Sequence, residues 1–491
     1  MNHLLVNDTP RPIDKLLRTF QRFASLEAAS GLVLMACALA ALVWANSTWG
    51  QSYARLWQTP VTLGFTPLAL SKPLLLWIND GLMALFFFLV GLEIKREMLI
   101  GELASFKRSA LPVMAAIGGM LVPAGLYACF NLSKPGEPGW GIPMATDIAF
   151  SLGVLALLGT RAPFALKIFL TALAIADDIG AVLVIALFYT GQISGTALLA
   201  AAALLAALIL VNRLGVQSIL PYVVLGVGLW LAMLKSGVHA TIAGILLAMC
   251  IPARPLGAWS PLAKLRTTLF RWRKRLPVPA RQTGLPEGVP HMASQQNPSP
   301  TAHPLNTPPQ NGDSLMIRLE HALHPWVSFG VMPLFALANA GVTIHGGLPE
   351  AINHPVSLGV LAGLVLGKPV GILSFSWLAV RLGIAALPNG AHWRHILGVG
   401  MLGGIGFTMS LFVAGLAFGQ TALLDSAKVG ILLASLMSGL AGGLFLLAAS
   451  RQRPAEWSAT EGGDLPRLAE RDREGERRNR HPAETPSRQR S

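Results

Sequence analysis

Twelve apolar segments, most of them close to the length that a helix needs to cross a bilayer, dominate this chain. They run near 25–46, 73–94, 109–130, 140–159, 164–189, 195–212, 217–235, 239–253, 326–346, 357–382, 395–418 and 426–449. A membrane-spanning helix needs about 20 predominantly apolar residues. Charged residues make up 13% of the chain, against about 25% in soluble domains. The sequence therefore predicts an all-α polytopic membrane protein with about twelve transmembrane helices.

Basic residues concentrate on one side of the predicted bundle. The N-terminal tail and the loops after every second segment carry most of them, whereas the opposite loops hold only Arg55, Lys72, Lys134, Lys235 and Lys428. By the positive-inside rule, both termini are then cytoplasmic and the number of spans is even. The net charge of +14 thus reflects membrane topology, and we expect no nucleic-acid partner.

Polar stretches divide the chain into five parts. We expect a cytoplasmic N-terminal segment (1–24), helices one to eight (25–253), a basic, Pro-rich and largely disordered cytoplasmic loop (254–318), helices nine to twelve (319–450) and a disordered charged cytoplasmic tail (451–491). No cleavable signal peptide is evident. The three cysteines lie in apolar segments without paired spacing, which indicates small buried residues rather than metal ligands or a disulfide. We expect no cofactor.

Two neighbouring carboxylates, Asp177 and Asp178, lie in the middle of the apolar stretch LKIFLTALAIADDIGAVLVIALFYTG. A charge near the bilayer centre costs between about 2.5 and more than 10 kcal/mol, depending on how it is measured. Adjacent helical positions differ by roughly 100° around the axis, so the two side chains face different ways. Such a pair is typical of a watery cavity, a proton site or a cation site, and it points to transport of a cation coupled to protons.

Two segments are interrupted by helix-breaking residues. Pro138, Gly141 and Pro143 precede Thr146 and Asp147 in the fourth segment, and the eleventh contains HILGVGMLGGIGFTMS. Glycine also serves close packing of membrane helices, so either segment alone would indicate little. Paired interruptions in corresponding positions of two halves, however, are typical of transporter sites. The sequence therefore favours an inverted-topology repeat with two discontinuous helices.

The deep charges suggest how the interruptions are balanced and what they bind. Asp147 can offset positive helix N-termini, and Lys368 in the tenth segment can offset carbonyl ends or pair with a carboxylate. Asp177, Asp178 and the Thr146 hydroxyl supply oxygen ligands for a transient Na⁺ or Li⁺. If the cation and protons compete for the same carboxylates, and the site opens to one side at a time, exchange follows.

The motifs resemble the NhaA family of Na⁺/H⁺ antiporters across about residues 15–450. They are NDGLMALFFFLVGLEIKRE (79–97), ATDIAFSLGVLALLG (145–159), LKIFLTALAIADDIGAVLVIALFYT (166–190), SGVHATIAG (236–244), LEHALHPW (319–326), LGKPVGI (366–372) and GGIGFTMSLF (403–412). This family is itself a standard example of inverted repeats with discontinuous helices.

The resemblance implies twelve helices with two crossed, unwound helices at mid-membrane in a bacterial inner-membrane protein. It implies that Asp177 and Asp178 form the ion and proton site, that Lys368 pairs with Asp177, and that Asp147 and Lys368 balance the crossing. It also suggests a homodimer. The residues that it associates with pH regulation are Glu93, Arg96, Glu97, His239, Glu320, His321 and His324.

Three other functions remain open. A membrane enzyme with paired aspartates would need a second acidic cluster or a partner aspartate motif, and neither is evident. An H⁺-driven carrier of organic solutes would need a roomier, aromatic-lined pocket, whereas aromatic residues make up only 7% of the chain. A structural or sensor protein would tolerate Asp178→Asn. The 47–72 loop shows no clear hairpin alternation.

Overall fold

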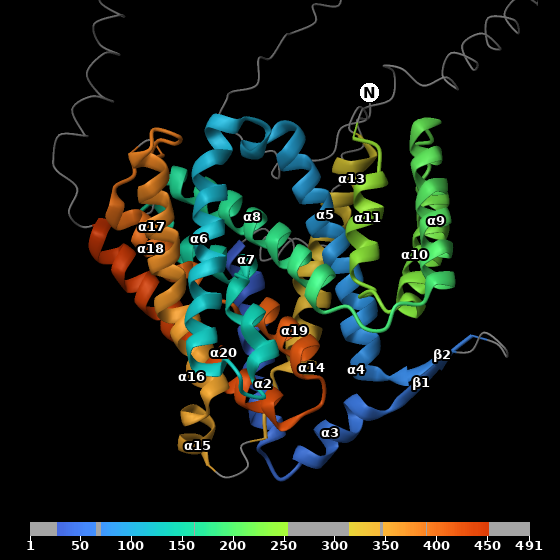
Figure 1. Ribbon diagram of the computed structural model, residues 1–491, viewed down its shortest axis with the longest axis horizontal. Coiled ribbons are helices and arrows are strands. Elements are labelled where there is room, and N and C mark those ends of the chain that lie inside the picture. The colour runs from blue at the N-terminus through green and yellow to red at the C-terminus, as the bar shows by residue number, and fades with distance from the viewer. Residues whose placement is uncertain are drawn as a thin grey trace, which may run out of the picture.

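The computed structural model describes residues 27–64, 70–161, 163–253, 314–343, 347–388 and 390–450. They form a bundle of long helices with a small two-stranded sheet at one end, called the hairpin end below (Figure 1). The helices are α2 (Glu27–Ala45), α3 (Gly50–Gln58), α4 (Leu74–Trp77), α5 (Met83–Ile100), α6 (Phe106–Asn131), α7 (Ile148–Leu157), α8 (Phe164–Phe188), α9 (Gly195–Arg213), α10 (Ile219–Ser236), α11 (Ile242–Cys250), α13 (Leu315–Trp326), α14 (Met332–Asn339), α15 (Leu348–Asn353), α16 (Pro355–Leu361), α17 (Lys368–Arg381), α18 (Trp393–Gly403), α19 (Phe407–Phe418) and α20 (Ala422–Ser450). The expectations for 1–24, for nearly all of 254–318 and for 451–491 lie outside the described residues.

The apolar pattern of the sequence corresponds to helices that could cross a membrane. Among the described residues, eight helices are long and apolar enough, and two bent pairs, α2–α3 and α18–α19, raise the number to ten. These ten coincide with ten of the twelve expected segments. The chain is therefore an all-α polytopic membrane protein, apart from the small sheet.

The other two expected segments differ from the structure. The eighth, near 239–253, contains only the nine-residue helix α11. The ninth was expected to begin near residue 326, but its helix begins at Leu315, where the Ser314 side chain accepts a hydrogen bond from the Ile317 N–H. Residues 315–318 were expected to belong to the loop, and residues 319–325, with charged and histidine side chains, were placed before the ninth apolar segment. They lie instead on a helix whose Leu315, Met316 and Leu319 are buried.

A β-hairpin occupies the loop in which no hairpin was evident. Strands β1 (Pro60–Leu63) and β2 (Leu70–Pro73) pair antiparallel, with Val61 opposite Lys72. The alternation was hidden because one of the less exposed positions of β2 is Lys72, whose ammonium reaches Asp80 at 2.8 Å. Each strand is also only four residues long.

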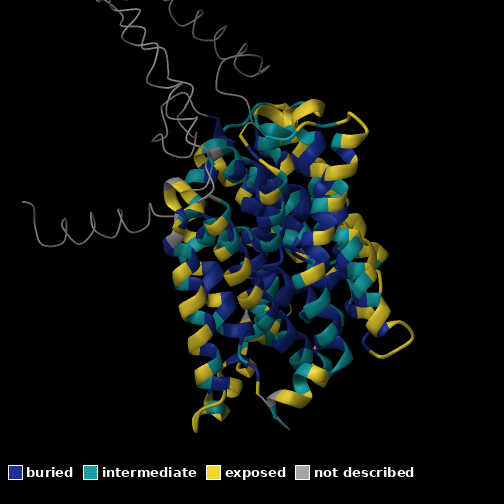
Figure 2. Cartoon of the chain, turned by 90° about the vertical axis from the view of Figure 1, so that its left-hand side faces the viewer, coloured by how far each residue is buried: buried dark blue, intermediate teal, exposed yellow. Residues whose placement is uncertain are grey.

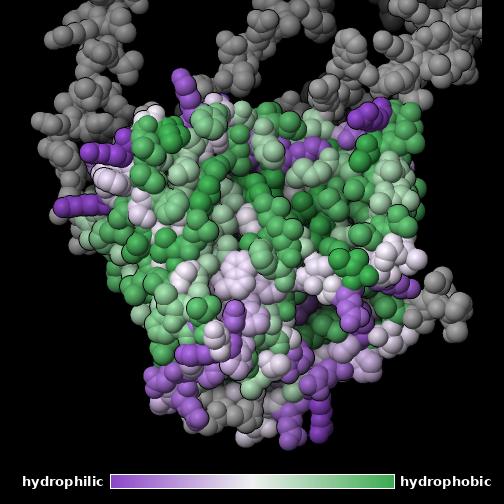
Figure 3. All heavy atoms as spheres, in the orientation of Figure 1, coloured by the Kyte–Doolittle hydropathy of each residue, from purple (hydrophilic) through white to green (hydrophobic). Residues whose placement is uncertain are grey.

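Burial follows the membrane setting. Buried residues fill the interior of the bundle, and exposed ones lie on its outside (Figure 2). Large apolar side chains are nevertheless exposed on α8, α9 and α10, for example Leu187, Leu199 and Leu220. Figure 3 shows hydrophobic side chains over much of one face and hydrophilic ones toward both ends of the bundle. An apolar exterior of this kind is expected where lipid is the solvent.

Helices α6 and α17 support the site by close backbone contact. Gly118 and Gly371 face each other, and a methyl group added at either position would overlap the carbonyl oxygen of the other. Small residues that let helix backbones approach are typical of membrane proteins. This contact holds Lys368, at the start of α17, inside the bundle.

Candidate functional site

The two interrupted segments meet inside the bundle. The first passes from a 3₁₀ helix (Glu137–Met144) through an extended stretch into α7, and the second is broken between α18 and α19 with a bend of 46°. The Asp147 N–H donates to the Ile405 carbonyl at 2.7 Å. The Thr146 hydroxyl donates to the Gly403 carbonyl at 2.9 Å, and the Ser151 hydroxyl to the Leu402 carbonyl at 3.0 Å. The first broken segment thus donates to the carbonyls of Leu402 and Gly403 at the end of α18 and to that of Ile405 in the break.

Asp147 joins the N-termini of two helices. As the N-cap of α7, its Oδ1 accepts the Phe150 N–H at 3.0 Å. Its Oδ2 accepts the Thr408 N–H at 3.1 Å, in the first turn of α19, and also the Thr408 hydroxyl. Helix N-termini carry partial positive charge and unpaired N–H groups, so a carboxylate is stabilised between them. Only 1% of Asp147 is exposed.

We expect Thr408→Val to destabilise the protein by about 1–3 kcal/mol, because it leaves a buried carboxylate with one donor fewer at almost unchanged volume. Thermal unfolding in detergent measures the effect. Thr421→Val, which removes a part-buried hydroxyl near the other end of α19, is the matched control. Equal melting temperatures for the two variants would contradict the assignment.

Asp177 and Lys368 form an ion pair in the core. The Lys368 ammonium donates to Asp177 Oδ2 at 2.6 Å, and both side chains are 1% exposed. Lys368 follows a π-helical turn (Ala362–Gly367) that leads into α17. Thr146 also lies beside the Asp177 carboxylate. Lys368 therefore neutralises Asp177.

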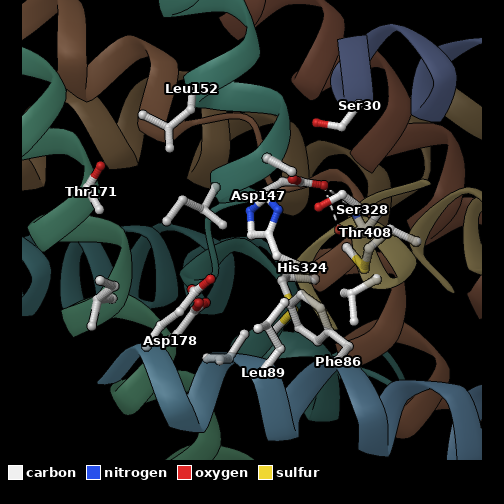
Figure 4. Close-up of a pocket in the computed structure, with 18 of the residues that line it drawn as sticks. Ser30, Phe86, Leu89, Asp147, Leu152, Thr171, Asp178, His324, Ser328 and Thr408 are labelled. Carbon is white, nitrogen blue, oxygen red and sulfur yellow. Dashed lines mark hydrogen bonds between the residues drawn. The ribbon is translucent and has the colours of Figure 1, made fainter. Parts of the chain in front are cut away.

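Asp178 faces a cavity of about 290 Å³. Only 2% of the residue is exposed, and its Oδ1 has no hydrogen-bond partner among the described residues. Thr146, Asp147 and Thr408 line the same cavity (Figure 4). A buried carboxylate oxygen without a partner is costly. Such an oxygen is suited to take up a proton or a cation from the cavity.

The cavity runs along α5 away from the hairpin end. Phe86, Leu89, Val90, Glu93 and Arg96 line it in that order, which corresponds to about 15 Å at 1.5 Å per residue. His324 and Lys167 line it as well. His324 is exposed and Arg96 is buried. The part of the cavity away from the hairpin end therefore carries several ionisable groups.

Arg96 forms ion pairs with two of the other residues predicted to sense pH. Its guanidinium contacts Glu320 at 2.6 Å and Glu97 at 3.2 Å, and Glu320 is 1% exposed. Glu93 and His324 lie on the cavity wall. His321 is not among the residues that line the cavity. His239 lies elsewhere, near the hairpin end, with its Nε2 3.9 Å from Asp80.

Two residues of the site were not predicted from the sequence. Thr408 holds Asp147, and Ser151 satisfies a carbonyl of α18. Both are hydroxyl residues within one turn of a helix interruption, and this position is the only signal that they give. Among the described residues, no group of three His, Cys, Asp or Glu side chains is placed to hold a resident metal ion.

A bundle of apolar helices with a charged, partly open cavity at two helix interruptions defines a membrane transport protein for a small ion. Residues 21–446 match the family described as Na⁺/H⁺ antiporter 1. The chain is 50% identical over 455 residues to "Na(+)/H(+) antiporter NhaA" of Oleidesulfovibrio alaskensis, covering 93% of this chain and 99% of the relative. It is 49% identical to "Na(+)/H(+) antiporter NhaA 2" of Syntrophotalea carbinolica and 48% identical to "Na(+)/H(+) antiporter NhaA" of Pseudomonas fluorescens (strain Pf0-1), each over 90% of this chain and 99% of the relative. The chain belongs to the NhaA family of Na⁺/H⁺ antiporters, which are transporters and not enzymes.

Proposed function

We propose that this protein is a secondary-active antiporter that extrudes Na⁺, or Li⁺, in exchange for protons across a bacterial inner membrane. The observation that carries the proposal is Oδ1 of Asp178, which has no hydrogen-bond partner among the described residues and is buried on the wall of a cavity that Glu93 and Arg96 also line. The names of the relatives supply the identity of the ions.

Competition at the carboxylates couples the two ions. A cation that binds at Asp178 needs the carboxylate deprotonated, and a proton that binds there removes the charge that holds the cation. Asp177 differs from Asp178 because Lys368 already neutralises it. Exchange is electrogenic if both aspartates give up protons for one monovalent cation, and we propose this stoichiometry.

The architecture of the family supports alternating access. We propose that the two interrupted segments cross as equivalent parts of an inverted repeat within twelve spans. The contacts of Asp147 and Thr146 with the α18–α19 break support the crossing. By loop charge, both termini are cytoplasmic and the hairpin end is extracytoplasmic. We also propose a homodimer, for which the β-hairpin offers an edge strand.

We propose regulation by pH for the part of the cavity away from the hairpin end. Arg96, Glu97 and Glu320 form one charged group there, with Glu93 and His324 on the adjoining wall. A change of charge in this group would alter the path by which a cation reaches Asp178. His321 and His239 belong to the same hypothesis, although His239 lies near the opposite end.

Competition predicts how the apparent KM for Na⁺ depends on pH. Below the pH at which the site loses its protons, each unit by which the pH falls raises the apparent KM for Na⁺. The rise is about tenfold for one competing proton and about hundredfold for two. Na⁺-induced proton efflux in everted vesicles from antiporter-deficient cells, between pH 6 and 9, measures it. Choline, which is too large for a small-cation site, is the control. A KM that stays constant while the maximal rate changes would contradict direct competition.

A further inference from the structure

The cavity ends at the same level on three helices. On α5 its last lining residue toward the hairpin end is Phe86, on α14 it is Met332, and on α19 it is Met409. On these three helices, no residue closer to the hairpin end lines the cavity, and the charged lining residues Glu93 and Arg96 lie on the other side of Phe86. A closure between the cavity and the hairpin end must therefore lie at or just beyond these positions.

Three buried phenylalanines lie at this level. Phe335 and Phe412 come three residues after Met332 and Met409, and Phe87 adjoins Phe86 on α5. Phe87, Phe335 and Phe412 are 1%, 0% and 3% exposed, and each comes from a different one of the three helices. The ring of Phe412 lies 5.5 Å from that of Phe87 and 6.3 Å from that of Phe335, centroid to centroid. It also meets the His239 ring edge-on at 5.2 Å. Phe412 is thus the centre of an aromatic layer, defined here as Phe87, Phe335 and Phe412.

A polar ring lies on the far side of the aromatic layer. Asn79 and Asn339 exchange two side-chain hydrogen bonds, at 2.9 and 3.3 Å. Asp80 contacts Lys72 of the hairpin at 2.8 Å and His239 at 3.9 Å. On α14, Met332 of the cavity and Asn339 of the polar ring are seven residues apart, or about 10 Å. Phe335 of the aromatic layer lies between these two residues on α14.

Irregular helix geometry accompanies the layer. A π-helical turn, Ile78–Leu82, carries Asn79 and Asp80 just before α5, and another, Val327–Val331, precedes Met332. Such turns occur frequently at functional sites and locally change helix register. Two of the three helices therefore contain a point at which the rings can shift without breaking the helix.

We propose that Phe87, Phe335 and Phe412 form the gate on the hairpin side of the cavity, and that the ring of Asn79, Asp80 and Asn339 is the outer mouth through which the cation passes. The gate is closed in this structure, and the cavity opens to the other end. Separation of the rings around Phe412 connects Asp178 to the hairpin side. The inference rests on the proposed alternating access, because a protein without a second opening needs no gate there.

Accessibility of a cavity cysteine tests the gate without measuring transport. Ser328, which lines the cavity (Figure 4), is changed to Cys after Cys37, Cys129 and Cys250 are replaced by Ala. A membrane-impermeant thiol reagent is added to right-side-out vesicles, from the side on which we place the hairpin. We expect slow labelling in the parent and at least a tenfold faster rate in Phe412→Ala. Phe418→Ala removes an equally large buried ring from the same helix outside the layer, and we expect it to leave the rate unchanged.

Several results would overturn the gate. They are equal labelling in the parent and Phe412→Ala, fast labelling in the parent, or an equal increase in Phe418→Ala. If Phe412→Ala does not fold, Phe335→Leu and Phe412→Leu keep the core filled and are expected to raise the rate less. Failure of the gate can be told apart from failure of the proposed function. If Asp178→Asn abolishes exchange but Phe412→Ala leaves the labelling rate of the cavity cysteine unchanged, the antiport proposal stands and only the gate is wrong.

Discussion

Replacement of Asp178 by asparagine is expected to abolish Na⁺-induced proton release. The amide keeps the shape of the side chain but neither exchanges a proton nor balances the charge of a bound cation. An uncompensated charge in a buried site costs about 3–5 kcal/mol, so Na⁺ should bind at least about a hundredfold more weakly. Everted vesicles report exchange, and calorimetry of the purified protein in detergent reports Na⁺ binding.

Asp425→Asn is the control for this experiment. Asp425 lies in the first turn of α20, partly exposed and outside the cavity lining, so its amide variant should exchange ions like the wild type. Antiport by Asp178→Asn with an unchanged KM would place the ion site elsewhere. Because Asn is almost isosteric with Asp, loss of exchange together with an unchanged melting temperature reports chemistry rather than misfolding.

The apolar pattern predicted most of the bundle for a simple physical reason. Segments long enough to span a bilayer have few alternatives to a helix, and ten of the twelve expected segments coincide with helices or bent pairs that could span a membrane. The pattern failed where charged side chains are wholly or partly buried because an oppositely charged residue from another part of the chain neutralises them. Glu320 lies on a buried helix face because Arg96 neutralises it, and Lys72 lies toward the protein because Asp80 does the same.

The charged residues of the site were visible in the sequence because a charge in an apolar segment is expensive and rarely accidental. Their neutral partners were not visible. Thr408 and Ser151 resemble any hydroxyl residue in a membrane helix until the second broken segment is placed against the first. The aromatic layer is further from prediction, since Phe87, Phe335 and Phe412 come from segments far apart in the chain and are related only by contact.

The Lys368–Asp177 pair should have the largest single effect on stability. Lys368→Met keeps much of the apolar volume but leaves Asp177 buried and unpaired, which is expected to cost about 3–5 kcal/mol. Lys428→Met is the control, because Lys428 donates to a neutral carbonyl, that of Gly341, at 3.3 Å, and its charged neighbour Asp425 is partly exposed. The loss there should be about 1 kcal/mol. Unfolding in mixed micelles at neutral pH measures both variants.

The double variant Asp177→Asn, Lys368→Met separates the ion pair from simple packing. If the cost of Lys368→Met comes from the unpaired carboxylate, removing that carboxylate should restore most of the lost stability, and the two single effects should not add. Additive losses would mean that Lys368 stabilises the bundle mainly through its aliphatic chain. Restored stability without restored exchange would show that the pair has a second role. In that case the fold needs only neutrality at this position, whereas transport needs the titratable groups themselves.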